Sequence, residues 1–208
     1  MPLTNIGVLI SGSGSNLQAL IDNTKSGYIK GEVKLVISNK KEAYGLIRAE
    51  KVGIETLYIN PKDFNSSEEY NREIIKELNK RNIELVVLAG YLKILSKGFA
   101  GEYKGRIINI HPSLIPSFSG KGYYGEKVHE EVLKYGVKVT GATVHFVDEG
   151  TDTGPIILQE IVEVYEDDTV TTLKERVLKV EHKLLPKAVK LYCDRKLSID
   201  ERKVVRLR

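Results

Sequence analysis

Short apolar runs alternate with longer amphipathic segments along the first half of this chain of 208 residues. The apolar runs predict buried β-strands at residues 6–10, 33–38, 55–59, 84–89 and 106–110. Between them, apolar positions spaced three and four residues apart predict helices at residues 16–25, 41–52 and 67–81. Ser66 and Glu69 match a capping box at the start of the last helix. Continuous apolar strands separated by helices are typical of a parallel sheet with helices on both faces.

The pattern changes in the second half of the chain. Residues 122–135 predict a helix that ends at Gly136. Two apolar runs, 137–147 and 155–164, are separated by a loop too short for a parallel crossover, so we expect them to pair antiparallel. Residues 169–192 predict a long helix.

Pro186 lies inside this long helix and predicts a kink or break there, and the polar residues 196–208 follow as a candidate edge strand. The sequence contains no linker or internal repeat. We therefore predict a single α/β domain over residues 1–208, with a Rossmann-like parallel sheet and an antiparallel C-terminal part.

The charge balance indicates which classes of binding partner to expect. Lysine and arginine total 32 against 28 acidic residues, which gives a net charge of +4. This mild bias favours anionic small molecules and falls short of the dense basic surface of a nucleic-acid-binding protein. The apolar runs are too short to span a bilayer, and the first residues lack a signal-peptide pattern. The single cysteine, Cys193, excludes an intrachain disulfide. We expect a cytoplasmic protein with no nucleic-acid or membrane partner.

The run INIHPSLIPS at residues 108–117 contains the most informative chemistry. Asn109 and His111 stand two residues apart at the end of a predicted strand, so their side chains point to the same face. Pro112 and Pro116 end the strand and stiffen the loop after it, and the bond before Pro116 is open to either isomer. A histidine at a strand end is most often an ordinary polar residue. A carboxamide donor beside an imidazole nevertheless suits a reaction in which negative charge grows on a carbonyl oxygen.

A glycine-containing loop, SGSGSNL at residues 11–17, joins the first predicted strand to the first predicted helix. The unpaired N–H groups at a helix start and the positive end of its dipole favour an anion. The loop has no Gly-Lys-Ser/Thr sequence and no third glycine, so it is neither a nucleoside-triphosphate loop nor a dinucleotide fingerprint. The small side chains predict a site for one compact phosphate, with a simple strand-to-helix turn as the alternative.

The loop between the two antiparallel runs reads DEGTDTGP at residues 148–155. Such a loop is most often a solvated turn. It follows the carboxyl end of a strand, however, and an acid from it beside His111 would raise the pKa of the imidazole. The four histidines and the cysteine show no metal-ligand spacing, so we predict no metal site. A Gly-x-Ser-x-Gly nucleophile pattern is also missing.

These three motifs in this order, together with LAGYLKIL at residues 88–95, resemble the phosphoribosylglycinamide formyltransferase family. That family comprises folate-dependent enzymes of purine biosynthesis. The resemblance extends over residues 6–182 and implies a phosphate-binding half at residues 1–110 and a catalytic, folate-binding half at residues 111–208. It implies 10-formyltetrahydrofolate as co-substrate, 5-phosphoribosylglycinamide as substrate, no metal, and a monomer or homodimer.

The resemblance also implies individual residue roles. Asn109, His111 and Asp152 would be catalytic. Asp152 is chosen over Asp148 because the family's aspartate stands seven positions after the histidine of the preceding strand, here His145. Residues implied to bind the ribosylglycinamide are Gly14, Ser15 and Asn16 for its phosphate and Glu181 for another part of the molecule. Residues implied to line the folate site are Leu92, Lys93, Ile94, Leu95, Asn109, Asp148, Glu149, Gly150, Thr151 and Asp152.

The implied mechanism is direct attack of the substrate amine on the N10-formyl carbon through a tetrahedral intermediate. Asn109 and a protonated His111 would donate to the oxyanion, and Asp152 would keep His111 charged. Two relatives share the Asn-x-His core: methionyl-tRNA formyltransferase, with an added C-terminal domain, and formyltetrahydrofolate hydrolase, with an added N-terminal domain. We expect neither addition here. A non-catalytic phosphate-binding module is the alternative from another class.

Overall fold

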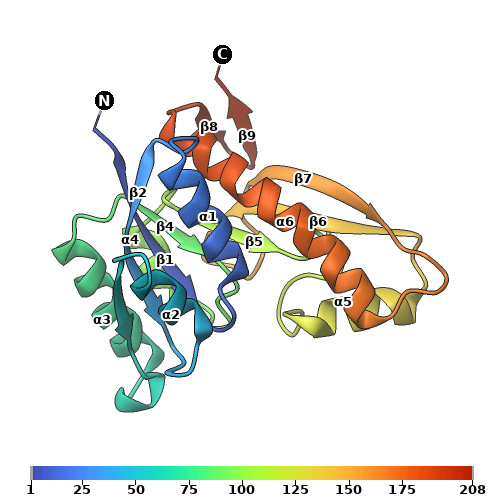
Figure 1. The fold of residues 1–208 in the computed structure, drawn as a ribbon, viewed down its shortest axis with the longest axis horizontal. Coiled ribbons are helices and arrows are strands. Elements are labelled where there is room, and N and C mark those ends of the chain that lie inside the picture. Colours follow the sequence, from blue (N-terminus) through green and yellow to red (C-terminus); the bar gives the residue numbers. More distant parts are fainter. Residues whose placement is uncertain (1, 208) are drawn as a thin grey trace.

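The computed structural model describes residues 2–207, and their strands form one nine-stranded sheet in the spatial order β3-β2-β1-β4-β5-β6-β7-β9-β8 (Figure 1). The strands are β1 (Thr4–Ile10), β2 (Gly31–Ser38), β3 (Glu55–Tyr58), β4 (Leu85–Leu88), β5 (Ile107–His111), β6 (Val139–Phe146), β7 (Ile156–Glu163), β8 (Leu197–Asp200) and β9 (Lys203–Arg206). The helices are α1 (Ser15–Lys25), α2 (Tyr44–Glu50), α3 (Ser67–Lys80), α4 (Lys97–Glu102), α5 (Glu126–Tyr135) and α6 (Val170–Cys193), with a 3₁₀ turn η1 (Pro61–Asp63).

Strand directions follow the predicted change from parallel to antiparallel. β1 to β5 pair parallel, whereas β6 runs antiparallel to both β5 and β7. The predicted fold class, a Rossmann-like sheet with an antiparallel C-terminal part, is therefore confirmed. β1 lies between β2 and β4, so the chain reverses its direction of winding beside β1. In open α/β sheets such a switch point creates a crevice at the carboxyl ends of the strands.

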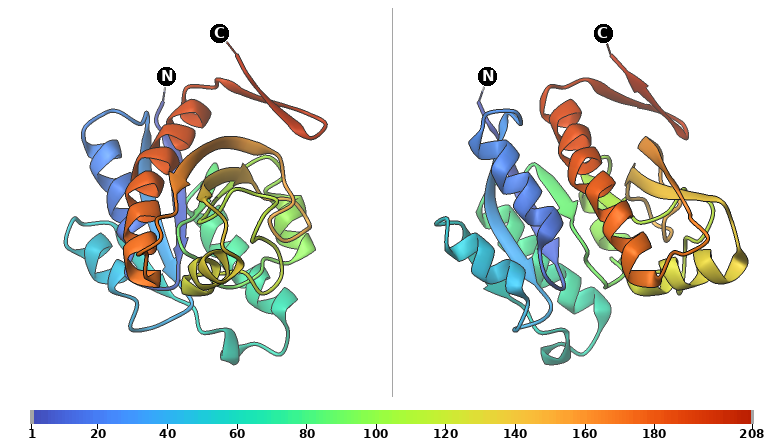
Figure 2. Two further views of the ribbon diagram at one scale, coloured as in Figure 1. Left: turned by 90° about the vertical axis from the view of Figure 1, so that its right-hand side faces the viewer. Right: turned by 45° about the vertical axis from the view of Figure 1, so that its right-hand side comes forward.

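Helices cover both faces of the sheet, and each face has its own apolar core. Val8 of β1 packs in a cluster with residues of α1, α2, α5 and α6, while the next residue, Leu9, packs in a cluster with residues of α3 and α4. This alternation follows from the two-residue period of a strand. The two views in Figure 2 show these helix layers on opposite sides of the sheet. No helix within residues 2–207 is both long enough and apolar enough to cross a membrane.

Several predicted boundaries are wrong, each for a local reason. α5 begins at Glu126 and not near residue 122, because Gly122 and Gly125 take positive φ angles of 96° and 55° that no helix admits. α6 continues through Pro186, so the predicted break does not occur. The buried residues around Pro186 stabilise the helix against the loss of one backbone hydrogen bond. α4 was not predicted, and the polar tail forms a hairpin, β8–β9, in place of one edge strand.

Candidate functional site

A cavity of about 650 Å³ opens at the carboxyl ends of β1, β4 and β5. Nearly all of the predicted site residues line it. They are Gly14, Ser15, Asn16, Leu92, Lys93, Ile94, Leu95, Asn109, His111, Asp148, Gly150, Thr151, Asp152 and Glu181. The exception is Glu149, whose carboxylate instead lies 3.7 Å from the Lys97 Nζ atom, with both side chains largely exposed. The volume is typical of a site for a drug-sized ligand.

The end of β5 holds Asn109 and His111 on the same face of the sheet, as their spacing predicted. β5 lies in the interior of the sheet, between β4 and β6, so its backbone is fixed on both sides. The loop after it is tied back to β6, because the Ile115 N–H donates to Thr143 Oγ1 over 3.1 Å. The Ile115–Pro116 bond is cis. Rigid strands of this kind hold side-chain geometry better than loops do.

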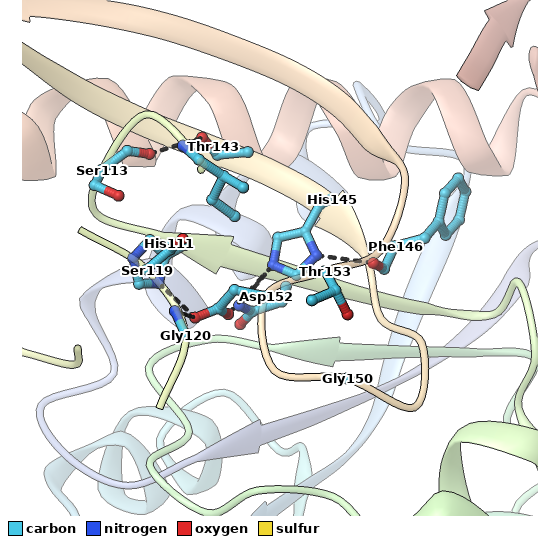
Figure 3. Close-up of polar contacts among 12 residues, drawn as sticks. His111, Ser113, Ser119, Gly120, Thr143, His145, Phe146, Gly150, Asp152 and Thr153 are labelled. Carbon is cyan, nitrogen blue, oxygen red and sulfur yellow. Dashed lines mark hydrogen bonds and ion pairs between the residues drawn. The ribbon is translucent and has the colours of Figure 1, made fainter. Parts of the chain in front are cut away.

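The Asp152 carboxylate lies between two imidazole rings (Figure 3). Asp152 Oδ2 is 3.5 Å from His111 Nδ1, and Oδ1 is 3.6 Å from His145 Nε2. The Gly120 N–H donates to Oδ2 over 2.9 Å. Asp152 itself has a φ of 57°, which is uncommon for a residue with a side chain. The structure therefore brings Asn109, His111 and Asp152 together.

His145 is a site residue that the sequence reasoning did not assign. It lies on β6 directly opposite Asn109 and is 1% exposed. Its Nδ1 donates to the Phe146 carbonyl over 2.8 Å, since a carbonyl only accepts. Its Nε2 lies 3.1 Å from the Asn109 amide Nδ2. The one sequence feature that could have identified His145 is its position seven residues before Asp152. Its pairing with Asn109 depends on the register of β5 and β6, which the sequence does not show.

Burial changes the expected charge of His111. Desolvation lowers the pKa of its imidazole below the usual value, although the Asp152 carboxylate and the Phe118 carbonyl act in the opposite direction. As predicted, an acid from the loop, Asp152, raises the pKa of His111, but the larger effect of burial makes the net shift downward. Burial raises the pKa of the Asp152 carboxyl, but His145, His111 and the Gly120 N–H together bring it below its usual value. Asp152 is thus an anion next to a histidine whose neutral form is favoured.

The loop after β1 presents the start of α1 to the cavity. Gly14 is the N-cap, with a φ of 70°, and the first intrahelical bond runs from Gln18 N to Gly14 O over 2.9 Å. The N–H groups before Gln18 therefore have no acceptor within the helix. A Cβ on Gly14 would lie 2.5 Å from Gly45 Cα, so only glycine fits there. These features suit an anion at this end of the cavity.

Glu181 on α6 joins this end of the cavity to α1. Its Oε2 accepts a hydrogen bond of 2.6 Å from Asn16 Nδ2, and the Asn16 Oδ1 atom is buried with no partner among the described residues. Burial raises the pKa of the Glu181 carboxyl to about 7, and the bond from Asn16 opposes this only in part. The Asn16 Nδ2 group thus bonds to Glu181, and the Asn16 backbone N–H remains for an anion.

The segment after β4 is hydrogen-bonded to the loop after β1. Ser11 Oγ accepts from the Leu92 N–H over 2.9 Å, and the Ser11 N–H donates to the Gly90 carbonyl over 3.1 Å. Leu92 and Ile94 remain 45% and 61% exposed. Such exposed apolar side chains at a cavity mouth suit an apolar ring system. Across residues 2–207, no three histidine, cysteine or acidic side chains are arranged to hold a metal ion.

Comparison with known proteins gives a consistent result. Residues 4–189 match the formyl transferase family. The phosphoribosylglycinamide formyltransferase of Escherichia coli (strain K12) is 44% identical over 197 residues, which cover 95% of this chain and 91% of that protein. The trifunctional purine biosynthetic protein adenosine-3 of Homo sapiens is 46% identical over 94% of this chain, which spans only 19% of that protein's length. The crystal structure of glycinamide ribonucleotide transformylase 1 from Symbiobacterium toebii superposes with a TM-score of 0.95, at 42% identity, over 99% of this chain and 95% of that one.

Proposed function

Because this chain belongs to the formyl transferase family, we propose that it transfers the formyl group of 10-formyltetrahydrofolate to the amine of 5-phosphoribosylglycinamide, a step of purine biosynthesis. The observation that supports this most directly is the convergence of one carboxamide, two imidazoles and one carboxylate at the cavity. Asp152 lies within 3.6 Å of both rings, and Asn109 lies 3.1 Å from His145. A site that only bound phosphate would not need this arrangement.

In the proposed chemistry, the substrate amine attacks the formyl carbon and the carbonyl oxygen becomes an oxyanion. The Asn109 amide donates one N–H to His145 Nε2, which leaves its second N–H for the oxyanion. His111 accepts the proton that the attacking nitrogen loses and passes it to N10 as the bond from carbon to N10 breaks. The products are the formylated amide and tetrahydrofolate, and no water is consumed.

Asp152 stabilises the imidazolium form of His111 during this transfer. In the free site, burial lowers the pKa of His111, so the ring is poised to accept a proton. The negative oxyanion that develops nearby favours the charged ring, and Asp152, 3.5 Å away, adds to this. In this mechanism His111 is neutral before the reaction, whereas the family resemblance led us to expect a histidine that is already protonated.

The two substrates occupy opposite ends of the cavity in this proposal. The sugar phosphate lies at the N–H groups of Gly14, Ser15 and Asn16, and Glu181 accepts from the ribose hydroxyls. The folate ring lies between two segments of opposite halves of the chain. These segments are residues 92–95 after β4 and residues 148–152 after β6.

Incubation of the protein with 10-formyltetrahydrofolate, with and without 5-phosphoribosylglycinamide, tests the proposal. Formyl transfer only when the amine is present supports it. Release of formate without the amine would indicate a hydrolase, and no turnover would leave a binding module.

Asn109→Ala tests the role of the carboxamide. Loss of one oxyanion donor is expected to reduce kcat by about 10²–10³ with little effect on substrate binding. Asn65→Ala, which removes an exposed carboxamide that does not line the cavity, is the matched control and should retain full activity. A normal kcat in Asn109→Ala would contradict the proposed oxyanion site.

A further inference from the structure

The loop that contains Asp152 is held at both ends by β-sheet hydrogen bonds. The Val147 N–H donates to the Ile107 carbonyl over 3.0 Å before the loop, and the Phe146 N–H donates to the Pro155 carbonyl over 2.9 Å after it. Residues 148–153 between these points are exposed or half-buried. The position of the Asp152 carboxylate therefore depends on what fixes this short stretch.

Two hydrogen bonds of the loop are internal. Asp148 Oδ1 accepts from the Gly150 N–H over 3.1 Å and from Thr153 Oγ1 over 2.5 Å. These bonds shape the loop but do not attach it to the rest of the protein. The loop is attached mainly by the Asp152 side chain itself, through Gly120, His111 and His145. The same carboxylate therefore attaches its own loop and faces the two imidazole rings.

Arg202 supplies an anchor from outside the loop. Its Nη2 donates to the Thr153 carbonyl over 3.0 Å. Among the hydrogen bonds of residues 2–207, this is the only one that reaches the main chain of 148–153 from another part of the protein. Thr153 directly follows Asp152, whose φ of 57° lies in the left-handed region that residues with a Cβ seldom adopt. A bond to the adjacent peptide group opposes relaxation of that conformation.

The hairpin β8–β9 brings Arg202 to this point. Arg202 lies in the turn between the two strands, and β9 pairs with β7 at Ile156 and Lys203, just after the loop. Figure 2 shows the hairpin projecting from the end of α6. The hairpin lies beyond residues 4–189, which match the family, so the family resemblance gives this arginine no role.

We infer that Arg202 is a positioning residue that holds the Asp152 loop in its active conformation through the Thr153 carbonyl. The kinetic consequence rests on the proposed function, in which the loop lines the folate end of the cavity. Removal of the guanidinium lets the loop relax, so Asp152 moves away from His111 and the folate contacts weaken. The sugar-phosphate end, formed by the start of α1, is unaffected.

The test compares Arg202→Ala with Arg206→Ala. The control removes the same charge from β9, where the Arg206 side chain forms no hydrogen bond or ion pair with residues 2–207. Arg202→Ala loses one hydrogen bond from a charged donor at an exposed site, so we expect its kcat/KM for 10-formyltetrahydrofolate to fall by about three- to tenfold. The KM for 5-phosphoribosylglycinamide should stay unchanged. Arg202→Lys, which keeps a cationic donor, should recover part of the loss. Equal effects on both substrates, or equal effects in Arg206→Ala, would overturn the inference.

A second readout does not require activity. Histidine NMR titration follows His111, which interacts electrostatically with Asp152, His145 and His129. Because the Asp152 carboxylate raises the pKa of His111, its displacement in Arg202→Ala should lower that pKa further, and Arg206→Ala should leave it unchanged. An unchanged His111 titration in Arg202→Ala would refute the positioning role. If the wild-type protein shows no formyl transfer but His111 responds as expected, the proposed function fails and the loop anchor stands.

Discussion

The buried carboxyl of Glu181 should make the protein less stable as the pH rises. The side chain is 8% exposed and accepts a hydrogen bond from Asn16. Burial raises the pKa of this carboxyl from 4.5 to about 7, because the charged form loses its hydration. The unfolded chain releases this proton near pH 4.5, whereas the folded protein retains it until about pH 7. The folded state is therefore progressively destabilised between these two values, and the full cost remains at higher pH.

The size of the effect follows from the two pKa values. The interval between 4.5 and about 7, at about 1.4 kcal/mol per pH unit, corresponds to about 3 kcal/mol at pH 8 and above. Glu181→Gln removes the titration and keeps an oxygen that accepts from Asn16. We therefore expect the variant to match the wild type near pH 4.5 and to exceed its free energy of unfolding by about 3 kcal/mol at pH 8.5.

Urea denaturation of both proteins at pH 5 and pH 8.5 measures this difference. The variant should also show a higher KM for 5-phosphoribosylglycinamide, since in the proposed site the carboxylate accepts from the ribose. A stability gained by losing a binding group would explain why a buried acid is retained. A difference in unfolding free energy that is the same at both pH values would refute the reasoning, because it would show that Glu181 does not titrate between them.

Two further substitutions test the other parts of the cavity. Gly14→Ala places a Cβ 2.5 Å from Gly45 Cα at a φ of 70°, so the start of α1 must shift. Because this shift displaces backbone N–H donors to the phosphate, steady-state kinetics should show a KM for 5-phosphoribosylglycinamide that is raised by about tenfold or more. Gly53→Ala has a similar φ of 76° but open space around it, and should lose only about 1 kcal/mol of stability. Asp152→Asn removes the charge that opposes burial at His111, so NMR titration should show a lower His111 pKa than in the wild type, and a higher pKa would contradict the assigned cause.

Local patterns in the sequence determined the elements and the chemistry at their ends. The two-residue period of a strand was enough to place Asn109 and His111 on one face, and a strand followed by a glycine loop and a helix was enough to place an anion site at Gly14. These features depend on bonds within a few residues, so the sequence contains them directly. The boundaries that failed, at Gly122 and Pro186, are places where backbone angles or surrounding packing outweigh the local pattern.

Only the tertiary structure decided which distant groups meet and in what charge state. Residue patterns alone left Asp148 and Asp152 both possible, and the resemblance to a family was needed to choose between them. The antiparallel register of β5 and β6 places His145 opposite Asn109, and the hairpin after α6 brings Arg202 to Thr153. The pKa of His111 falls because many segments together exclude water from it, which outweighs the single carboxylate beside it. Strand register and desolvation both depend on contacts between segments that are distant in the chain, so no short stretch of sequence specifies them.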